Sequence, residues 1–153
     1  LFVPIMLLIA AFIGACAGST GGGIKVIRAL ILLRKGSSEI TKLIHPNAVV
    51  TIKFGKKTLD PKVSESVWGF FAVYVATFLL ILMFLLSQNN DFLTSFSAVG
   101  ATLNNLGPGL GSVSENYKDM TDISKLVLCI SMLLGRLEIF TLLLIFTPAF
   151  WRN

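Results

Sequence analysis

The sequence predicts an all-α integral membrane protein, and three observations carry that prediction. Of the 153 residues, 54% are hydrophobic and 14% are charged, with a mean hydropathy of +0.81, which is rare for a soluble domain of this length. The longest apolar segments are continuous rather than alternating, which indicates helices and not the strands of a barrel. Two glycine-rich stretches, Gly14–Gly23 and Thr102–Gly111, interrupt the apolar segments and predict irregular backbone at membrane depth.

Residues 1–33 are expected to form a broken transmembrane helix with an intramembrane loop over residues 14–23. The apolar run Leu1–Ile13 is followed by small residues, and the helical pattern resumes at Ile24. A continuous helix is disfavoured because each interior glycine costs about 1 kcal/mol relative to alanine. Close helix packing over small residues is the alternative, although two or three such residues on one face would suffice for it.

The end of this loop, Gly18-Ser-Thr-Gly-Gly-Gly-Ile-Lys25, contains the residue types of a nucleotide-binding P-loop. That motif requires Gly-Lys followed directly by Ser or Thr, and it follows a strand. Here Ile24 separates Gly23 from Lys25, and the preceding segment is an apolar membrane stretch. Neither nucleotide binding nor an organic cofactor is therefore expected in this chain.

Residues 34–66 are expected to form a cytoplasmic loop. By the positive-inside rule, its excess of basic side chains over three acids places it on that side; the basic residues are Arg34, Lys35, Lys42, Lys53, Lys56, Lys57 and Lys62. Alternation of β-branched and polar residues between Asn47 and Leu59 predicts a small hairpin. In a membrane protein the location of the formal net charge of +5 matters more than its sum, so contact of this basic segment with anionic lipid headgroups is expected rather than nucleic-acid binding. A solvated topological anchor is the alternative for each lysine.

Residues 67–86 form the clearest transmembrane helix, because they are apolar, uncharged and long enough for about 30 Å. A turn follows, in which Asn90 or Asp91 can cap the next helix. Residues 91–103 have a helical pattern but reach only about 20 Å, which is too short to cross a bilayer. They are expected to form a re-entrant pore helix whose C-terminal end, with its partial negative charge, favours a cation.

The segment 104–111 follows this short helix and is interpreted as the lining of an ion path. Glycine accepts a positive φ, so successive carbonyl oxygens can face one axis. Such a row of oxygens can replace the water shell of a monovalent cation. Asn104, Asn105, Leu106 and Gly107 are therefore expected to form one wall of a selectivity filter. An ordinary outer turn is the alternative, because Gly-Pro-Gly is common in turns.

Residues 126–150 are expected to form the last transmembrane helix, with Arg136 and Glu138 inside it. If the helix begins near Leu126, Arg136 lies roughly 15 Å along it, where a charge usually faces a bundle interior or a watery cavity. Glu138 is two residues away and points elsewhere around the helix. The freed carbonyls of Gly14–Gly23 are the expected partners of Arg136, and a structural arginine that ties helices together is the alternative.

Three stretches of the chain together resemble one family. Phe96–Gly111 resembles the fourth pore loop of the bacterial Trk-type potassium-uptake channel subunits, the TrkH family of the Trk/Ktr/HKT superfamily. Gly14–Lys25 and Gly135–Phe140 resemble the same family and lie in its order. The resemblance implies the C-terminal portion of a four-repeat cation channel, namely the end of the third repeat plus the complete fourth helix–pore loop–helix repeat over residues 67–153.

The resemblance also implies a function and partners. The transported ligand would be potassium, contacted through Asn105, Leu106 and Gly107. Gating would involve the loop below the filter together with an arginine, and the residues concerned are Gly18, Ser19, Thr20, Gly21, Gly22, Gly23 and Arg136. The full-length subunit would be a multi-pass protein of the bacterial inner membrane, a homodimer, and the partner of a cytosolic TrkA-like nucleotide-binding regulatory subunit.

Two transport mechanisms remain open, a channel-like pore and a secondary cation symporter with broken helices. A symporter would be expected to carry an ionisable residue at its coupling-ion site, and Arg136 is a poor ligand for a cation. An enzyme is not expected, because the sequence has no paired Ser/His/Asp arrangement, no HExxH motif and no cysteine-based metal spacing. Cys16 and Cys129 are expected to be free thiols. One filter wall cannot conduct alone, so the fragment is not expected to function by itself.

Overall fold

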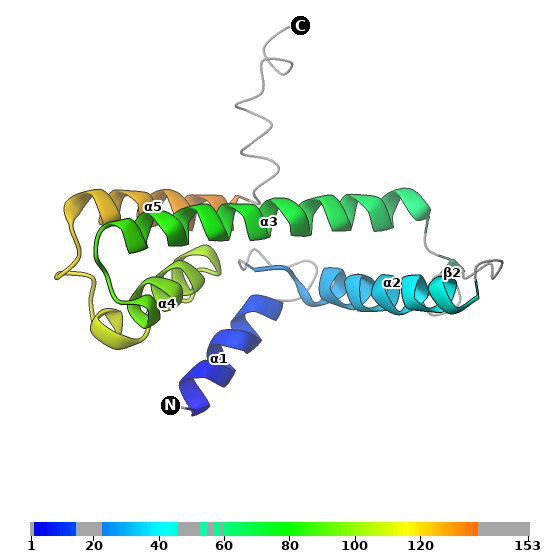
Figure 1. Ribbon diagram of the computed structural model, residues 1–153, viewed down its shortest axis with the longest axis horizontal. Helices are drawn as coiled ribbons and strands as arrows, with labels where there is room; N and C mark the ends of the chain where they lie inside the picture. Colours follow the sequence, from blue (N-terminus) through cyan, green and yellow to red (C-terminus); the bar gives the residue numbers. More distant parts are fainter. Residues whose placement is uncertain (1, 15–22, 46–52, 55–56, 59, 138–153) are drawn as a thin grey trace, which may run out of the picture.

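The computed structural model describes residues 2–14, 23–45, 53–54, 57–58 and 60–137. Within these ranges the prediction of an all-α protein is confirmed, and the strands are two residues long. The elements in chain order are α1 (Phe2–Ile13), α2 (Val26–Ile44), β1 (Lys53–Phe54), β2 (Lys57–Thr58), α3 (Pro61–Ser87), α4 (Phe92–Leu103), the 3₁₀ turn η1 (Gly111–Val113) and α5 (Asp122–Arg136). Figure 1 shows α3 along the long axis, with α2 beside one half of it and α4 beside the other.

The helix α3 is the long axis of the fold. Its 27 residues extend for about 40 Å, and it is the one helix in the described ranges that is long and apolar enough to cross a bilayer. It begins at Pro61 rather than at residue 67, because Asp60 caps it by accepting the Lys62 backbone N–H at 3.0 Å and Pro61 occupies the first turn. The added residues, 61–66, include the charged side chains of Lys62 and Glu65.

The first two helices are separated at the glycine-rich stretch. Gly14 and Gly23 both have positive φ, at 75° and 86°, which glycine adopts without the steric cost of a Cβ. The backbone N–H of Ile24 donates to the Phe12 carbonyl at 3.2 Å, so the chain returns to the point where α1 ended. Residues 15–22, with most of the predicted loop, lie outside the described ranges.

The expectation that a loop begins at residue 34 is wrong, because α2 continues to Ile44. Glu39 lies 3.0 Å from Lys35 and 3.2 Å from Lys42, which are spaced i,i+4 and i,i+3 along the helix and support it locally. The hydrogen bond from Lys35, followed in size of effect by that from Lys42, lowers the pKa of Glu39 below its usual value. Residues 34–44, the first part of the predicted loop, therefore belong to an amphipathic helix.

The predicted hairpin is present in the described residues of that region. Lys53 pairs with Thr58 and Phe54 pairs with Lys57 in an antiparallel register. Residues 46–52, 55–56 and 59 lie outside the described ranges. A short antiparallel ladder therefore stands between α2 and α3, where alternation of β-branched and polar residues predicted it.

The short helix α4 is the centre of the packing. Nearly every residue from Thr94 to Leu103 is buried, because α4 contacts α1, α3 and α5. Its partners in the core come from α3 and from the segment after α4, and they include Tyr74, Phe78, Leu85, Val113 and Leu128. A short helix whose last ten residues are almost all buried is typical of a re-entrant helix enclosed by longer ones.

The last described helix, α5, differs from its prediction at the start. It begins at Asp122 rather than near Leu126, because Thr121 caps it and accepts the Ser124 backbone N–H at 3.4 Å. Arg136 is its last residue, about 20 Å from the start rather than roughly 15 Å. Residues 138–153, with Glu138 and the rest of the predicted span, lie outside the described ranges. Cys129 is a free, exposed thiol.

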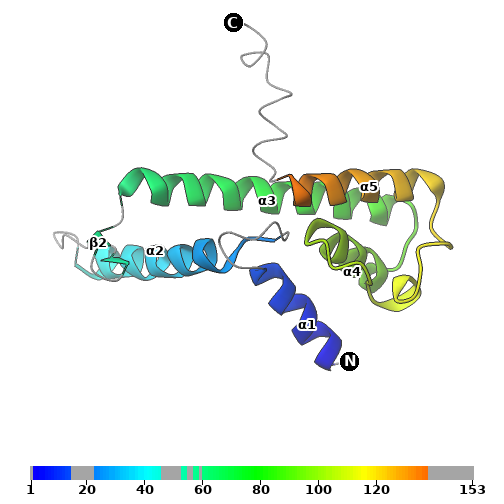
Figure 2. The same ribbon diagram turned by 180° about the vertical axis from the view of Figure 1, so that it is seen from behind.

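The ends of four helices lie near the middle of α3. In Figures 1 and 2 the C-terminal ends of α1, α4 and α5 and the N-terminal end of α2 converge at one level along the long axis. The ring of Phe12, at the end of α1, lies 5.6 Å from that of Phe78 in α3 and 6.3 Å from that of Phe96 in α4. The predicted filter begins at this level, immediately after α4.

Candidate functional site

The C-terminal end of α4 passes into the predicted filter through a hydrogen-bonded turn. The Leu106 N–H donates to the Ala101 carbonyl at 2.8 Å, and the Asn105 N–H donates to the Thr102 carbonyl at 3.1 Å. This 6→1 and 5→2 pair is a Schellman motif, which requires a left-handed residue after the helix. Asn105 occupies that position with φ 56°, and asparagine tolerates it better than most residues. The turn therefore fixes the direction in which the chain leaves α4.

Asn104 joins this turn to α3. Its side-chain Oδ1 accepts the hydroxyl of Tyr74 at 2.9 Å, and its Nδ2 donates to the Gly100 carbonyl at 2.7 Å. Tyr74 is 4% exposed and Asn104 is 7% exposed, so this bond lies inside the protein. The Asn104 side chain is thus occupied by protein groups, and the backbone is the part of this residue that can face an ion path.

Tyr74 is a neighbour of the predicted filter that sequence analysis did not connect with it. A buried tyrosine normally finds a partner for its hydroxyl, so its place in the middle of an apolar helix was a usable signal. What the sequence could not supply was the partner, which lies 30 residues further along the chain.

The far end of the segment is tied to both α4 and η1. The Leu110 N–H donates to Ser97 Oγ of α4 at 2.8 Å, and the Gly109 N–H donates to the Val113 carbonyl of η1 at 3.1 Å. A Cβ at Gly109 would lie 2.6 Å from the Val113 side chain, and one at Gly111 would lie 2.6 Å from Thr94 Oγ1. Close approach to η1 therefore requires Gly109, and close approach to α4 requires Gly111.

Gly107 stands between the two anchored ends and has a different constraint. Its φ is +100°, and a Cβ built on it would meet no atom within 4 Å. Substitution there would strain the backbone without a clash, because L-residues rarely adopt this φ. Asn105, Leu106 and Gly107 are all exposed, and the oxygens of this stretch are uncharged carbonyls and amides. Such oxygens suit weak, reversible binding of a monovalent cation.

The inner end of the segment is in direct contact with α5. A Cβ at Gly135 would lie 2.0 Å from the Leu103 carbonyl oxygen and 2.9 Å from Asn105 Nδ2. The hydroxyls of Thr102 and Ser131 lie 3.2 Å apart and join the same two helices. Arg136 follows Gly135 directly and is exposed at the end of α5. Its charge is therefore carried at the level where the predicted filter begins.

The predicted gating residues are only partly described. Gly18, Ser19, Thr20, Gly21 and Gly22 lie outside the described ranges, and Gly23 has φ 86° beside Ile24. The ring of Phe12, just before this stretch, lies against α3 and α4, and Ile24, just after it, is hydrogen-bonded to the Phe12 carbonyl. The residues that flank the glycine-rich stretch therefore lie close to α4. The contact expected between the loop and Arg136 stays a prediction.

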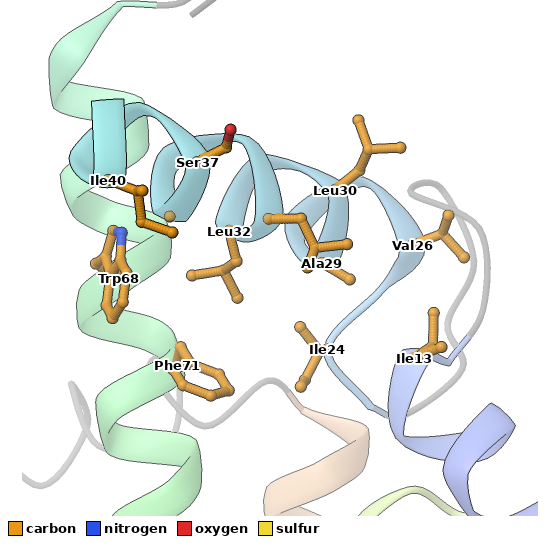
Figure 3. A pocket seen from close by; sticks show the side chains of 12 residues that line it. Ile13, Ile24, Val26, Ala29, Leu30, Leu32, Ser37, Ile40, Trp68 and Phe71 are labelled. Carbon is orange, nitrogen blue, oxygen red and sulfur yellow. The ribbon is translucent and has the colours of Figure 1, made fainter. Parts of the chain in front are cut away.

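An open groove of about 800 Å³ is separate from the predicted filter. It is lined by residues of α2, the end of α1 and the first half of α3, and Figure 3 shows Trp68 and Phe71 on one side with Leu32 and Ile24 near them. Almost all of its lining side chains are hydrocarbon. Such a surface cannot replace the hydration shell of an ion, so the groove is not a candidate for direct ion binding.

The chain matches known proteins over its whole length. The family model TrkH, described as a cation transport protein, matches residues 2–153. The chain is 51% identical over 153 residues to the Trk system potassium uptake protein TrkH of Escherichia coli (strain K12), and 54% identical over 153 residues to that of Vibrio parahaemolyticus. Each alignment covers 100% of this chain and 32% of the relative, so the chain spans about a third of their length.

A solved structure has the same fold. The crystal structure of the potassium transporter TrkH from Vibrio parahaemolyticus matches with a TM-score of 0.89 at 54% identity. The match covers 99% of this chain and 32% of that chain. The all-helical arrangement described above is therefore that of one portion of a membrane transporter.

Proposed function

The chain belongs to the TrkH family of cation transport proteins, and on that premise we propose that it supplies one wall of a potassium-selective filter in a potassium uptake protein. The potassium assignment rests on the names of the relatives, which are potassium uptake proteins. The wall would consist of the backbone at Asn104, Asn105, Leu106 and Gly107, with potassium contacted at the last three. The remaining walls would come from the part of the protein that this chain does not include.

One observation supports this proposal most strongly. A helix of 12 residues, buried over nearly all of its last ten, ends in a Schellman turn and passes into exposed, uncharged backbone at Asn105 and Gly107, both with positive φ. The alignment of peptide dipoles in α4 gives its C-terminal end a partial negative charge, which attracts a cation to the same place. The geometry thus combines three features: the chain leaves α4 in a fixed direction, its backbone carbonyl groups lie in an exposed stretch, and the partial charge of the helix end favours a cation.

Substitution of Gly107 tests the proposal in the full-length protein. Gly107→Ala forces an L-residue to φ +100°, at a cost of about 1–3 kcal/mol, and is expected to reduce the ratio of potassium to sodium uptake at normal abundance. Gly36→Ala is the control, since it lies in α2 with open space around its Cβ. An unchanged ratio in Gly107→Ala would remove this residue from the filter. Uptake tied to a fixed number of protons would instead indicate a symporter.

We also propose the gate that the family resemblance implies and the topology that the distribution of basic residues implies. Residues 14–23 would obstruct the pore below the filter, with Arg136 as their partner and as a barrier to cations. Residues 34–66 would be cytoplasmic and residues 87–90 and 112–124 external. The full-length protein would be an inner-membrane homodimer that meets a TrkA-like nucleotide-binding subunit. Single cysteines at Glu65 and Ser114 of the cysteine-free full-length protein would report the topology, and labelling of position 65 from outside intact cells would contradict it.

A further inference from the structure

The outer loop contacts the predicted filter through one hydrogen bond. The hydroxyl of Tyr117 donates to the Gly107 carbonyl oxygen at 2.8 Å. Tyr117 lies between η1 and α5, and its half-buried ring packs against the core around α4. The bond therefore joins a loop that follows the filter by ten residues to the carbonyl at the filter's exposed turn.

Gly107 lies between two groups of residues that are anchored by hydrogen bonds. Asn105 and Leu106 are held by the Schellman turn, and Gly109 and Leu110 are held by Val113 and Ser97. Between these anchors, Pro108 has no N–H and cannot donate a backbone bond. Gly107 itself has φ +100°, and a Cβ built on it would meet no atom within 4 Å, so packing at that position does not hold the residue in place.

We propose that Tyr117 is a positioning residue that holds the Gly107 carbonyl in one direction and thereby contributes to the preference for potassium over sodium. This inference rests on the proposed function of residues 104–107. A carbonyl oxygen has two acceptor lone pairs; the tyrosine occupies one of them and resists rotation of the Gly107–Pro108 peptide. Without that bond the carbonyl can turn and adjust its distance to a smaller cation, so discrimination between the two cations falls.

The test uses Tyr117→Phe in the full-length protein, because phenylalanine keeps the ring and removes the hydroxyl. The measurement is the ratio of potassium to sodium uptake in reconstituted vesicles. We expect this ratio to fall by about threefold to tenfold, in line with the loss of one hydrogen bond. Since both fluxes pass through the same molecules, a lower yield of the variant does not change the ratio.

The matched control is Thr77→Val. The Thr77 hydroxyl also donates to a backbone carbonyl at 2.8 Å, that of Val73, but this bond lies within α3. Valine has nearly the same shape, and the control is expected to keep the wild-type ratio. A fall of equal size in Thr77→Val would show that any lost hydroxyl perturbs selectivity and would overturn the proposal.

Comparison with Gly107→Ala separates the two hypotheses. If Gly107→Ala lowers the ratio and Tyr117→Phe does not, the tether is wrong while the filter assignment stands. If neither variant changes the ratio, the filter assignment itself fails. Equal loss of both fluxes in Tyr117→Phe, with folded protein at wild-type amount, also overturns the proposal, because it assigns the tyrosine to the structure of the loop.

Discussion

Gly135 offers the sharpest test of how α5 meets the predicted filter. A Cβ at this position would lie 2.0 Å from the Leu103 carbonyl oxygen, and its other close neighbours are the Leu103 carbonyl carbon and Asn105 Nδ2. The first two are backbone atoms at the end of α4 and cannot move away as a flexible side chain could. Gly135→Ala must therefore displace either α5 or the start of the filter.

The size of the effect follows from these distances. Because real Cβ contacts essentially never fall below 3.0 Å, the carbonyl has to retreat by about 1 Å. Overpacking of this kind costs about 1–3 kcal/mol. Part of that cost is offset by the higher helix propensity of alanine, up to about 1 kcal/mol. We expect a net destabilisation of about 1–2 kcal/mol together with a lower potassium to sodium ratio.

Gly36→Ala makes the sign of the result informative. Gly36 is also a helical glycine, and a Cβ there would meet no atom within 4 Å. Propensity alone then applies, and the substitution should stabilise the protein by up to about 1 kcal/mol. Both variants of the full-length protein would be measured by thermal unfolding in detergent and by cation uptake in vesicles. A Gly135→Ala protein as stable and as selective as the wild type would refute the close contact.

Three further predictions concern the same region. Tyr74→Phe leaves Asn104 Oδ1 buried without its 2.9 Å donor and should lower the free energy of unfolding by about 1–3 kcal/mol; an unchanged unfolding midpoint would contradict this. Arg136→Ala should raise potassium uptake per folded molecule by about fivefold, as for a barrier lower by about 1 kcal/mol, whereas reduced uptake at normal abundance would contradict a barrier role. Burial raises the pKa of Tyr117 above its usual 10.0, so the hydroxyl stays protonated and can donate its hydrogen bond at neutral pH. The contribution of this bond to stability is therefore full below pH 10 and is lost as the pH rises further. A ratio of potassium to sodium uptake that changes between pH 6 and 9 would contradict the proposed role of Tyr117.

Sequence periodicity and end signals predicted the positions of α3 and α4 well. The uncharged run at 67–86 lies within α3, and the polar turn before Asp91 gives way to α4 at Phe92. These features are local, since they depend on the apolar period and on capping residues within a few positions. The start of α5 was missed because Thr121 caps a first turn that carries Asp122 and Lys125, and charges of that kind also occur in loops.

The rest could not be predicted because it depends on contacts between distant residues. The basic stretch from Arg34 to Ile44 is helical rather than a loop. The helix α2, to which it belongs, buries Ile31 and Ser38 against neighbouring structure. The pairing of Tyr74 with Asn104 and the approach of Gly135 to Leu103 join segments about 30 residues apart. A periodic pattern shows which face of a helix is apolar and does not show which residue will lie opposite it.

The bond between Ile24 and the Phe12 carbonyl has a consequence for how this region can vary. It links the last turn of α1 directly to the residues that lead into α2, by a backbone bond that depends on no side chain. A substitution that moves the end of α1 is therefore expected to move the start of α2 with it.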